Sequence, residues 1–266
     1  MTDAFLDRPG ARIAYDLAGP DDAPNTLLAL HGLTSSRAYQ DRVGVYDWSP
    51  IAHAGERIAR IDARGHGAST GEPDPEVYRW PALAEDLLAL ADAVIPDAPV
   101  DGLGESMGCG TLVTAAVRRP ERFRKLVLVI PPTGWETRAA QAGMYAAAAD
   151  LVEQRGLDAW IRAVSVYPPT PILAAGGWRL DPEPSVSEAL LPSVLRGSAA
   201  SDFPDDAAVA ALEHETLILP WTTDLGHPVS TAERLAELLP NATLEIADTP
   251  DKIRGWGPRV AEFLAS

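Results

Sequence analysis

Cysteine is almost missing from this chain of 266 residues, in which Cys109 stands alone. An intramolecular disulfide is therefore excluded, and because a reducing compartment fits this composition, we expect a cytoplasmic protein. No stretch approaches the roughly 20 apolar residues that a membrane span needs. The opening MTDAFLDRPG carries acidic residues where a signal peptide would be basic. These features predict a protein without a membrane partner.

Basic residues are also scarce. The chain has 22 Lys and Arg against 38 Asp and Glu, which gives a formal net charge of -16. A charge of this sign repels phosphate backbones and anionic lipid headgroups, so we expect no nucleic-acid partner. The sequence also lacks a phosphate-cradling glycine loop and a cluster of metal ligands, so we expect no cofactor and no metal.

Short apolar runs alternate with helical patterns along most of the chain, as is typical of a mainly parallel sheet covered on both faces. The run at residues 27–30 has no polar alternation, which favours a strand buried on both faces. The first 18 residues differ, because two alternating runs flank a turn signal at Pro9 and Gly10. We therefore predict an α/β fold whose mainly parallel sheet begins with an antiparallel hairpin.

Residues 133–213 interrupt this rhythm with an Ala-rich helical piece, a Pro-rich stretch and no convincing buried strand. We interpret them as a helical cap inserted over the carboxyl edge of the sheet, where open α/β sheets bind ligands. The core then comprises residues 1–132 and 214–266. An irregular excursion without a binding role is the alternative. Five aromatic residues of this segment are candidates for a pocket lining or for ordinary packing: Trp135, Tyr145, Trp160, Tyr167 and Trp178.

The sequence GESMG at residues 104–108 has the G-x-S-x-G spacing of a nucleophile turn. A strand pattern precedes it and a helix pattern follows it. In such a strand-to-helix turn the strained backbone exposes the serine hydroxyl, and the flanking glycines let neighbouring backbone approach closely. This context predicts that Ser106 is a nucleophile. Glu105 immediately precedes it, and the sequence does not fix the direction of that side chain.

Four stretches, in order, resemble the α/β-hydrolase superfamily, in its branch of small enzymes with a helical cap. They are LALHGLTSS at residues 28–36, IDARGHGAS at 61–69, GESMG, and TLILPWTTDLGHPVSTAERLAELLPNATLEI at 216–246. The resemblance implies that Ser106 is the nucleophile and that Asp224 is the acid of a catalytic triad. It also implies that the backbone N–H groups of Leu33 and Met107 form an oxyanion hole.

The same resemblance implies a catalytic histidine just before the last helix, yet IADTPDKIRGWGPRVAEFL at residues 246–264 contains none. We therefore expect the triad histidine to be absent and leave the general base open. Lys252 and Asp251 are candidates, because burial can lower the pKa of an ammonium and a second carboxylate can raise that of an acid. His227 is a third candidate, although its place before a proline is more typical of a residue that steers the next helix.

Two functions follow from these observations. The first is a serine-hydrolase-like enzyme that acts through Ser106 on a small to medium ester, thioester or lactone, with an atypical or missing general base. The second is a non-hydrolytic protein on the same scaffold, either a cofactor-free lyase or isomerase or a ligand-binding protein. In both cases the expected partner is a small molecule with an apolar part. The oligomeric state is left open.

Overall fold

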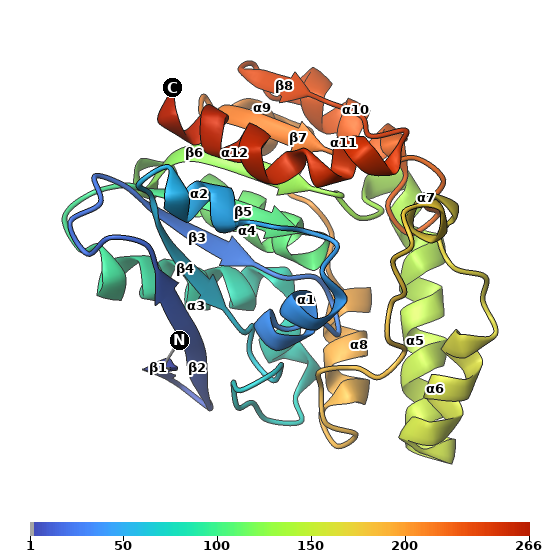
Figure 1. The fold of residues 1–266 in the computed structure, drawn as a ribbon. Coiled ribbons are helices and arrows are strands. Elements are labelled where there is room, and N and C mark those ends of the chain that lie inside the picture. Colours follow the sequence, from blue (N-terminus) through green and yellow to red (C-terminus); the bar gives the residue numbers. More distant parts are fainter. Residues whose placement is uncertain (1–2) are drawn as a thin grey trace.

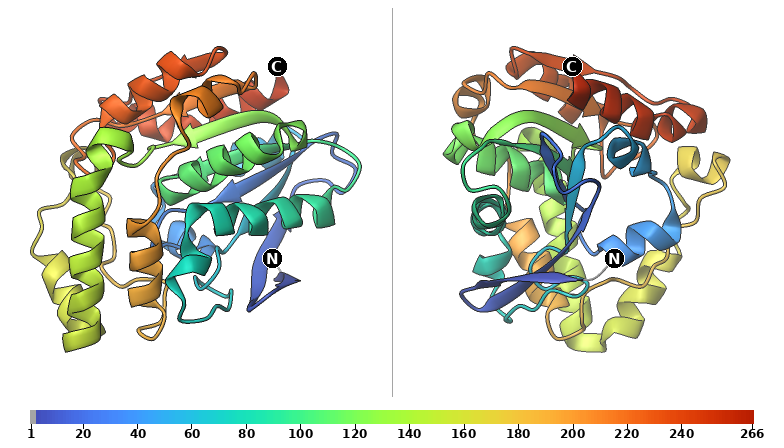
Figure 2. Two further views of the ribbon diagram at one scale, coloured as in Figure 1. Left: turned by 180° about the vertical axis from the view of Figure 1, so that it is seen from behind. Right: turned by 60° about the vertical axis from the view of Figure 1, so that its left-hand side comes forward.

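A computed structural model describes residues 3–266 of the chain. One eight-stranded sheet, in the order β1-β2-β4-β3-β5-β6-β7-β8, runs through the molecule with helices on both faces (Figures 1 and 2). β2 pairs antiparallel with β1 and β4, and the remaining neighbours are parallel. The predicted α/β class and the N-terminal hairpin are confirmed.

The strands are short, and the central ones are enclosed. β3 is buried along its whole length because helices cover both of its faces, which matches the absence of polar alternation in residues 27–30. The strands are β1 (Ala4–Arg8), β2 (Ala11–Ala18), β3 (Thr26–Leu30), β4 (Arg57–Ile61), β5 (Val100–Glu105), β6 (Phe123–Val129), β7 (Glu215–Leu219) and β8 (Ala242–Leu244).

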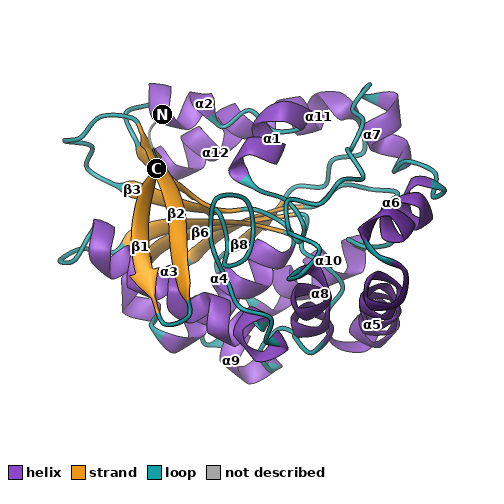
Figure 3. Ribbon diagram, turned by 90° about the horizontal axis from the view of Figure 1, so that it is seen from below, coloured by secondary structure: helices purple, strands orange, loops and turns teal. Residues whose placement is uncertain are grey.

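The helices fall into two layers around the sheet and a further group at one end (Figure 3). They are α1 (Arg37–Val43), α2 (Ser49–His53), α3 (Trp80–Val94), α4 (Met107–Arg118), α5 (Arg138–Arg155), α6 (Leu157–Ser165), α7 (Pro171–Ala175), α8 (Leu191–Ala199), α9 (Asp206–Ala210), α10 (Val229–Leu238), α11 (Pro250–Arg254) and α12 (Trp256–Ala265). Three 3-10 turns complete the set: η1 (Pro75–Tyr78), η2 (Pro120–Arg122) and η3 (Trp135–Thr137).

Each face of the sheet carries its own apolar core. On one face, α3, α4 and α10 bury aliphatic side chains against the strands. On the other, α12 places Trp256, Val260 and Leu264 against the sheet, and all three are buried. These residues recur at helical spacing, so the helix has one apolar side, and burying that side in the core drives its docking.

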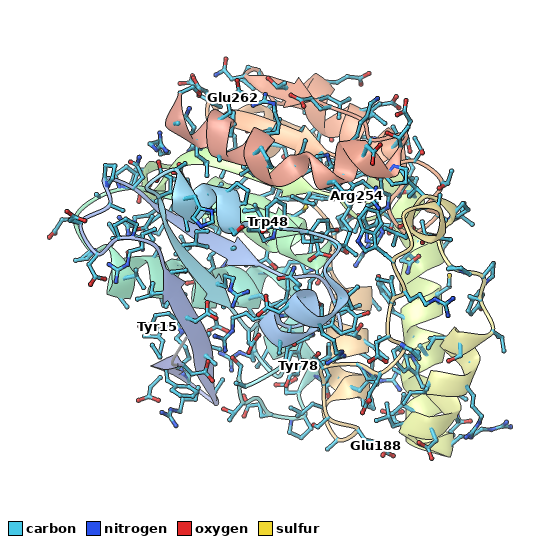
Figure 4. The ribbon with its side chains drawn as sticks, viewed as in Figure 1. Tyr15, Trp48, Tyr78, Glu188, Arg254 and Glu262 are labelled. Atoms are coloured by element: carbon cyan, nitrogen blue, oxygen red, sulfur yellow. The ribbon has the colours of Figure 1, made fainter. Side chains whose placement is uncertain are left out.

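The segment between β6 and β7 is helical, and its main helices stand beyond the carboxyl ends of the strands (Figure 1). α5 packs against α6 and α8, and together they enclose a third apolar cluster that includes Val152, Trp160 and Val194. α8 also packs on η1, where Tyr78 lies close to Gly197 (Figure 4). α9, in contrast, contacts α4 and α10 of the sheet layer.

Candidate active site

Ser106 occupies a sharp turn between β5 and α4. Its backbone has φ 51° and ψ -111°, a conformation that a residue with a Cβ adopts only at a cost in free energy. The turn is held because the Ser106 N–H donates to the Val129 carbonyl at 3.0 Å and the Cys109 N–H donates to the Ser106 carbonyl at 2.8 Å. The surrounding structure therefore fixes the backbone of this serine in a strained form.

The two glycines of the motif are required by close backbone contacts. A Cβ at Gly104 would lie 2.3 Å from the Gly108 carbonyl oxygen, and a Cβ at Gly108 would lie 2.8 Å from the Leu30 carbonyl oxygen. Both distances are too short for carbon against oxygen, and these are backbone atoms that cannot swing aside. The G-x-S-x-G spacing thus lets α4 start directly against β5 and β3, which exposes Ser106 at the end of the sheet.

The Ser106 hydroxyl is hydrogen-bonded to a histidine, and that histidine to a carboxylate. Ser106 Oγ lies 2.7 Å from His227 Nε2, and His227 Nδ1 lies 2.9 Å from Asp224 Oδ2. The expectation that the triad histidine is absent is therefore wrong. The histidine is His227, which lies in the loop between β7 and α10, three residues after Asp224. The sequence signal is Asp224-x-x-His227 in the loop that follows a buried strand, and of the three candidate bases His227 is the one that the structure brings to Ser106.

Asp224 is fixed by donors on both of its oxygens. The Trp221 indole Nε1–H donates to Oδ2 at 2.8 Å, and the Gly226 N–H donates to Oδ1 at 2.9 Å. Burial alone would raise the pKa of this carboxyl, but the neighbouring His227 and the two donors together lower it below its usual range. Asp224 is therefore a charged group that orients the imidazole.

The other two candidate bases lie elsewhere. Lys252 is half exposed and pairs with Asp248 at 2.9 Å, and the Asp251 side chain is 92% exposed and pairs with Arg254. α11 exposes Asp251, Lys252 and Arg254 on the surface of the molecule, and Figure 4 labels Arg254 on this helix. Neither Lys252 nor Asp251 lines a cavity at Ser106. The prediction that placed them at the nucleophile is corrected because this short helix turns both side chains towards solvent.

The loop after β3 lies against the nucleophile. A Cβ on Gly32 would be 3.2 Å from Ser106 Cβ, and Leu33 and Ser106 line the same cavity. Met107 begins α4 immediately after the nucleophile. The assignment of the Leu33 and Met107 N–H groups to an oxyanion hole stays a prediction, and this arrangement brings both residues next to Ser106.

Two buried histidines brace this loop. His66 Nε2 accepts a hydrogen bond from the Thr34 N–H at 3.3 Å, and His31 Nε2 accepts one from the Ala63 N–H at 3.0 Å. The Nδ1 of each ring faces a backbone carbonyl, at 2.7 Å for His31 and 2.8 Å for His66. Burial lowers both pKa values, that of His66 to about 3, so both rings are neutral. They bind backbone and stand apart from the Ser106 hydroxyl.

We expect His66 to make the stability of the fold depend on pH. Its pKa is about 3 in the fold against about 6.5 in an unfolded chain. Below pH 6.5 the unfolded form therefore binds more protons, and the contribution to stability is lost as the pH falls towards 3. Between pH 6 and 4.5, His66→Gln should reduce the slope of unfolding free energy against pH by up to about 1.4 kcal/mol per unit. Urea unfolding measures this slope, and parallel slopes in both proteins would contradict the prediction.

Two cavities meet at Ser106 and His227. The first, of about 360 Å³, extends from Ser106 towards α1 and is lined by Glu105, so the structure fixes a direction that the sequence did not. The second, of about 520 Å³, lies under α5 and α6. Of the five aromatic candidates, Tyr145, Trp160 and Tyr167 line these cavities. Trp135 stacks on Phe203, and the Trp178 indole donates to the Gly44 carbonyl.

Within residues 3–266, no group of three or more His, Cys, Asp or Glu side chains is arranged to hold a metal ion. Over the same range, no helix combines the length and the apolar character that a membrane crossing requires.

Comparisons with known proteins point in one direction. Residues 25–149 match the family model described as the alpha/beta hydrolase fold. The chain is 28% identical over 250 residues to a putative carbamate hydrolase RutD from a Caulobacter species, covering 86% of this chain and 84% of the relative. It is 30% identical over 142 residues to an sn-1-specific diacylglycerol lipase from Mus musculus, covering 53% and 44%.

A solved structure resembles the whole chain. It is the enol-lactonase from Burkholderia xenovorans, with a TM-score of 0.80 and 20% identity over 99% of this chain and 100% of that one. A likeness at this identity concerns the fold. The curated relatives, in turn, are named as hydrolases or lipases.

Proposed function

The chain belongs to the α/β-hydrolase superfamily, and we propose that it hydrolyses an ester, thioester or lactone with an apolar part through an acyl-enzyme on Ser106. One observation carries this proposal: the Ser106 hydroxyl, the His227 imidazole and the Asp224 carboxylate form one hydrogen-bonded chain. A nucleophile, a base and a group that orients the base are what acyl transfer by serine requires.

In the acylation step, Ser106 Oγ attacks the substrate carbonyl carbon while His227 Nε2 takes the hydroxyl proton. Negative charge develops on the carbonyl oxygen, and the N–H groups of Leu33 and Met107 stabilise it. The tetrahedral intermediate then collapses, the bond to the leaving alcohol or thiol breaks, and His227 gives that group its proton. Asp224 stabilises the imidazolium that exists between these two transfers.

Deacylation repeats the sequence with water. His227 Nε2 takes a proton from a water molecule as its oxygen attacks the acyl carbon, and the second intermediate releases the carboxylic acid. Ser106 Oγ leaves with the proton held by His227, which restores the free enzyme. The second cavity, under α5 and α6, is lined mainly by apolar side chains such as Met144, Leu151 and Val164. It suits the apolar part of the substrate.

A ligand-binding protein or a cofactor-free lyase is the alternative that the sequence left open. The strained backbone of Ser106 and its 2.7 Å contact with His227 favour catalysis over ligand binding, because a binding protein has no need of either. A carbamate carbonyl, as in the name of the Caulobacter relative, is open to the same attack. Either the bond to the alcohol oxygen would then break, which leaves a carbamoyl group on Ser106, or the bond to nitrogen would break, which releases an amine or ammonia.

A fluorophosphonate serine probe tests this function directly. We expect a stoichiometric covalent adduct by intact mass, because a base-activated Oγ displaces fluoride from phosphorus. The adduct should be absent in Ser106→Ala and at least a hundredfold slower to form in His227→Ala. A folded wild-type protein that forms no adduct would overturn the acyl-enzyme proposal. Turnover of p-nitrophenyl esters from acetate to octanoate then identifies the preferred acyl length.

A further inference from the structure

The first cavity at Ser106 has an unusual set of charges. Four carboxylates line it, and among residues 3–266 no lysine or arginine does. We call it the acidic cavity. Its carboxylates are Glu105, Asp181, Glu183 and Asp224. Asp224 is engaged with His227 and Asp181 pairs at 3.0 Å with Arg42, a side chain that is 56% exposed. Glu105 and Glu183 form no ion pair with a Lys or Arg of residues 3–266, so they are the carboxylates without a cationic partner.

Glu105 lies at the inner end of the acidic cavity, one residue before the nucleophile. Gln40 Nε2 donates to its Oε2 in a short hydrogen bond. Burial raises the pKa of the Glu105 carboxyl, while the hydrogen bond from Gln40 and the charge of His227 oppose that rise. A carboxylate that is largely removed from water gains most from a positive partner, because the local dielectric constant is low.

A polar atom without a well-formed hydrogen bond stands beside this carboxylate. The Tyr46 hydroxyl is buried and belongs to a residue that lines the acidic cavity; it interacts with the Glu105 carboxylate but forms no hydrogen bond of standard geometry within residues 3–266. Burial and then the charge of Glu105 raise its pKa well above the usual range. A buried hydroxyl without a well-formed hydrogen bond carries a free-energy cost, which a ligand in the cavity would remove.

Aromatic rings complete the walls. Tyr39, Tyr46, Trp160 and Trp221 line the acidic cavity, and the rings of Tyr46 and Trp221 stack with centroids 6.2 Å apart. Tyr39 already holds a cation, because the Arg42 guanidinium lies 5.3 Å from its ring centroid. Ring faces attract cations through their quadrupole, and quaternary ammonium groups are recognised by such walls.

We propose that the acidic cavity binds a positively charged nitrogen of the substrate, so that the preferred ester carries an ammonium group on one side of the scissile bond. This proposal rests on the hydrolase function proposed above. The apolar chain lies on the other side, in the cavity under α5 and α6, which no Asp, Glu, Lys or Arg of residues 3–266 lines. Substrates with a carboxylate are rejected in the acidic cavity, because Glu105 and Glu183 repel them.

A matched pair of esters tests the proposal. Butyrylcholine carries a trimethylammonium group, and 3,3-dimethylbutyl butyrate has the same shape with carbon in place of the charged nitrogen. For the wild type, we expect the ratio of kcat/KM for butyrylcholine to kcat/KM for 3,3-dimethylbutyl butyrate to be at least ten at low salt. The ratio should fall at high salt, because salt screens exposed charges such as that of Glu183. Glu105→Gln should reduce this ratio at least fivefold, and the rim variant Glu183→Gln about twofold.

Asp251→Asn is the matched control, because it removes one carboxylate that is exposed and far from the cavity. Its ratio should stay within twofold of wild type. Binding of the two alcohols gives a readout that needs no turnover: by calorimetry, Ser106→Ala should bind choline at least tenfold more tightly than 3,3-dimethylbutanol.

The outcomes separate the two proposals. A wild-type ratio near or below one, or a ratio that Glu105→Gln leaves unchanged, overturns the cation site even when Ser106→Ala abolishes turnover of both esters. If no serine adduct forms and neither ester is consumed, the hydrolase function fails, and the calorimetric comparison alone then decides the cation site. Equal affinity for the two alcohols overturns it.

Discussion

Replacing His227 with alanine lowers the kcat/KM for a model ester at least a thousandfold, whereas Lys252→Ala keeps it within twofold. Residues of a catalytic triad act as a unit, so removing the base leaves only what binding and the oxyanion amides supply. Lys252 instead pairs with Asp248 on the surface, and a surface pair contributes little even to stability. Initial rates with a p-nitrophenyl ester, and circular dichroism to verify folding, measure the effect.

His227 and Lys252 are compared because the sequence makes each of them a candidate base. Asp251→Asn serves as the third member of the set and should also stay within twofold of wild type. A His227→Ala protein that retains more than a tenth of the activity would exclude this histidine as the base. A Lys252→Ala protein that loses more than tenfold would return the base to the loop before the last helix.

Asp62→Ala should cost about 3–5 kcal/mol in the free energy of unfolding, the largest effect on stability that we expect. Asp62 Oδ1 accepts the Arg37 N–H at 2.8 Å, and Oδ2 accepts the guanidinium at 2.9 Å and the Ala68 N–H at 3.0 Å. Burial disfavours the charged form of Asp62, yet these donors hold its pKa below the usual range. Without Asp62, the buried Arg37 keeps only Asp16 and Asp3 as partners.

Urea unfolding at pH 7 measures this cost, and Asp248→Ala is the control because its partner Lys252 is half exposed. The control should change the unfolding free energy by less than about 0.5 kcal/mol. A loss below about 1 kcal/mol for Asp62→Ala would mean that Arg37 finds full compensation from its other partners. Because Asp62 links the loops after β3 and β4, we also expect the variant to loosen the loop that carries Leu33.

Much of the fold could be predicted from local patterns. The unbroken apolar run at residues 27–30 predicts an enclosed strand, and Pro9 and Gly10 predict the hairpin turn, because these signals depend only on neighbours in sequence. The nucleophile turn could be predicted for the same reason: Gly104 and Gly108 flank Ser106 within five residues. The steric contacts that require the glycines lie within the same strand-turn-helix unit and β3 beside it.

The identity of the general base was harder to predict, because it depends on the tertiary path of the loop between β7 and α10. The resemblance to relatives implies a base at residues 249–252, whereas His227 lies in another loop, which follows β7. Hydrogen bonding to Ser106 requires the β7 loop to fold back over the nucleophile, and no local pattern encodes that path. A spacing of three after Asp224 was compatible with a pair, but it was equally compatible with a turn that caps α10.

The residues that line the acidic cavity could not be predicted from the sequence either. Glu105 follows a strand and could point to either side of the turn, and Tyr46 belongs to an irregular stretch between α1 and α2. Asp181 and Glu183 come from a Pro-containing loop of the helical segment. These four residues span more than 130 positions of the chain, so their shared location depends on the tertiary fold.

The short spacing between Asp224 and His227 has a consequence for robustness. The acid and the base are only three residues apart in sequence, so their contact forms within one loop and does not require two distant loops to meet. Fraying of α11, which carries neither member of the pair, therefore leaves this short connection intact. For His227 to reach the Ser106 hydroxyl, the β7 loop and the β5 turn must stay aligned. The carboxyl-terminal residues still act on the pair indirectly: Trp256 of α12 stacks on Trp221, whose indole donates to Asp224.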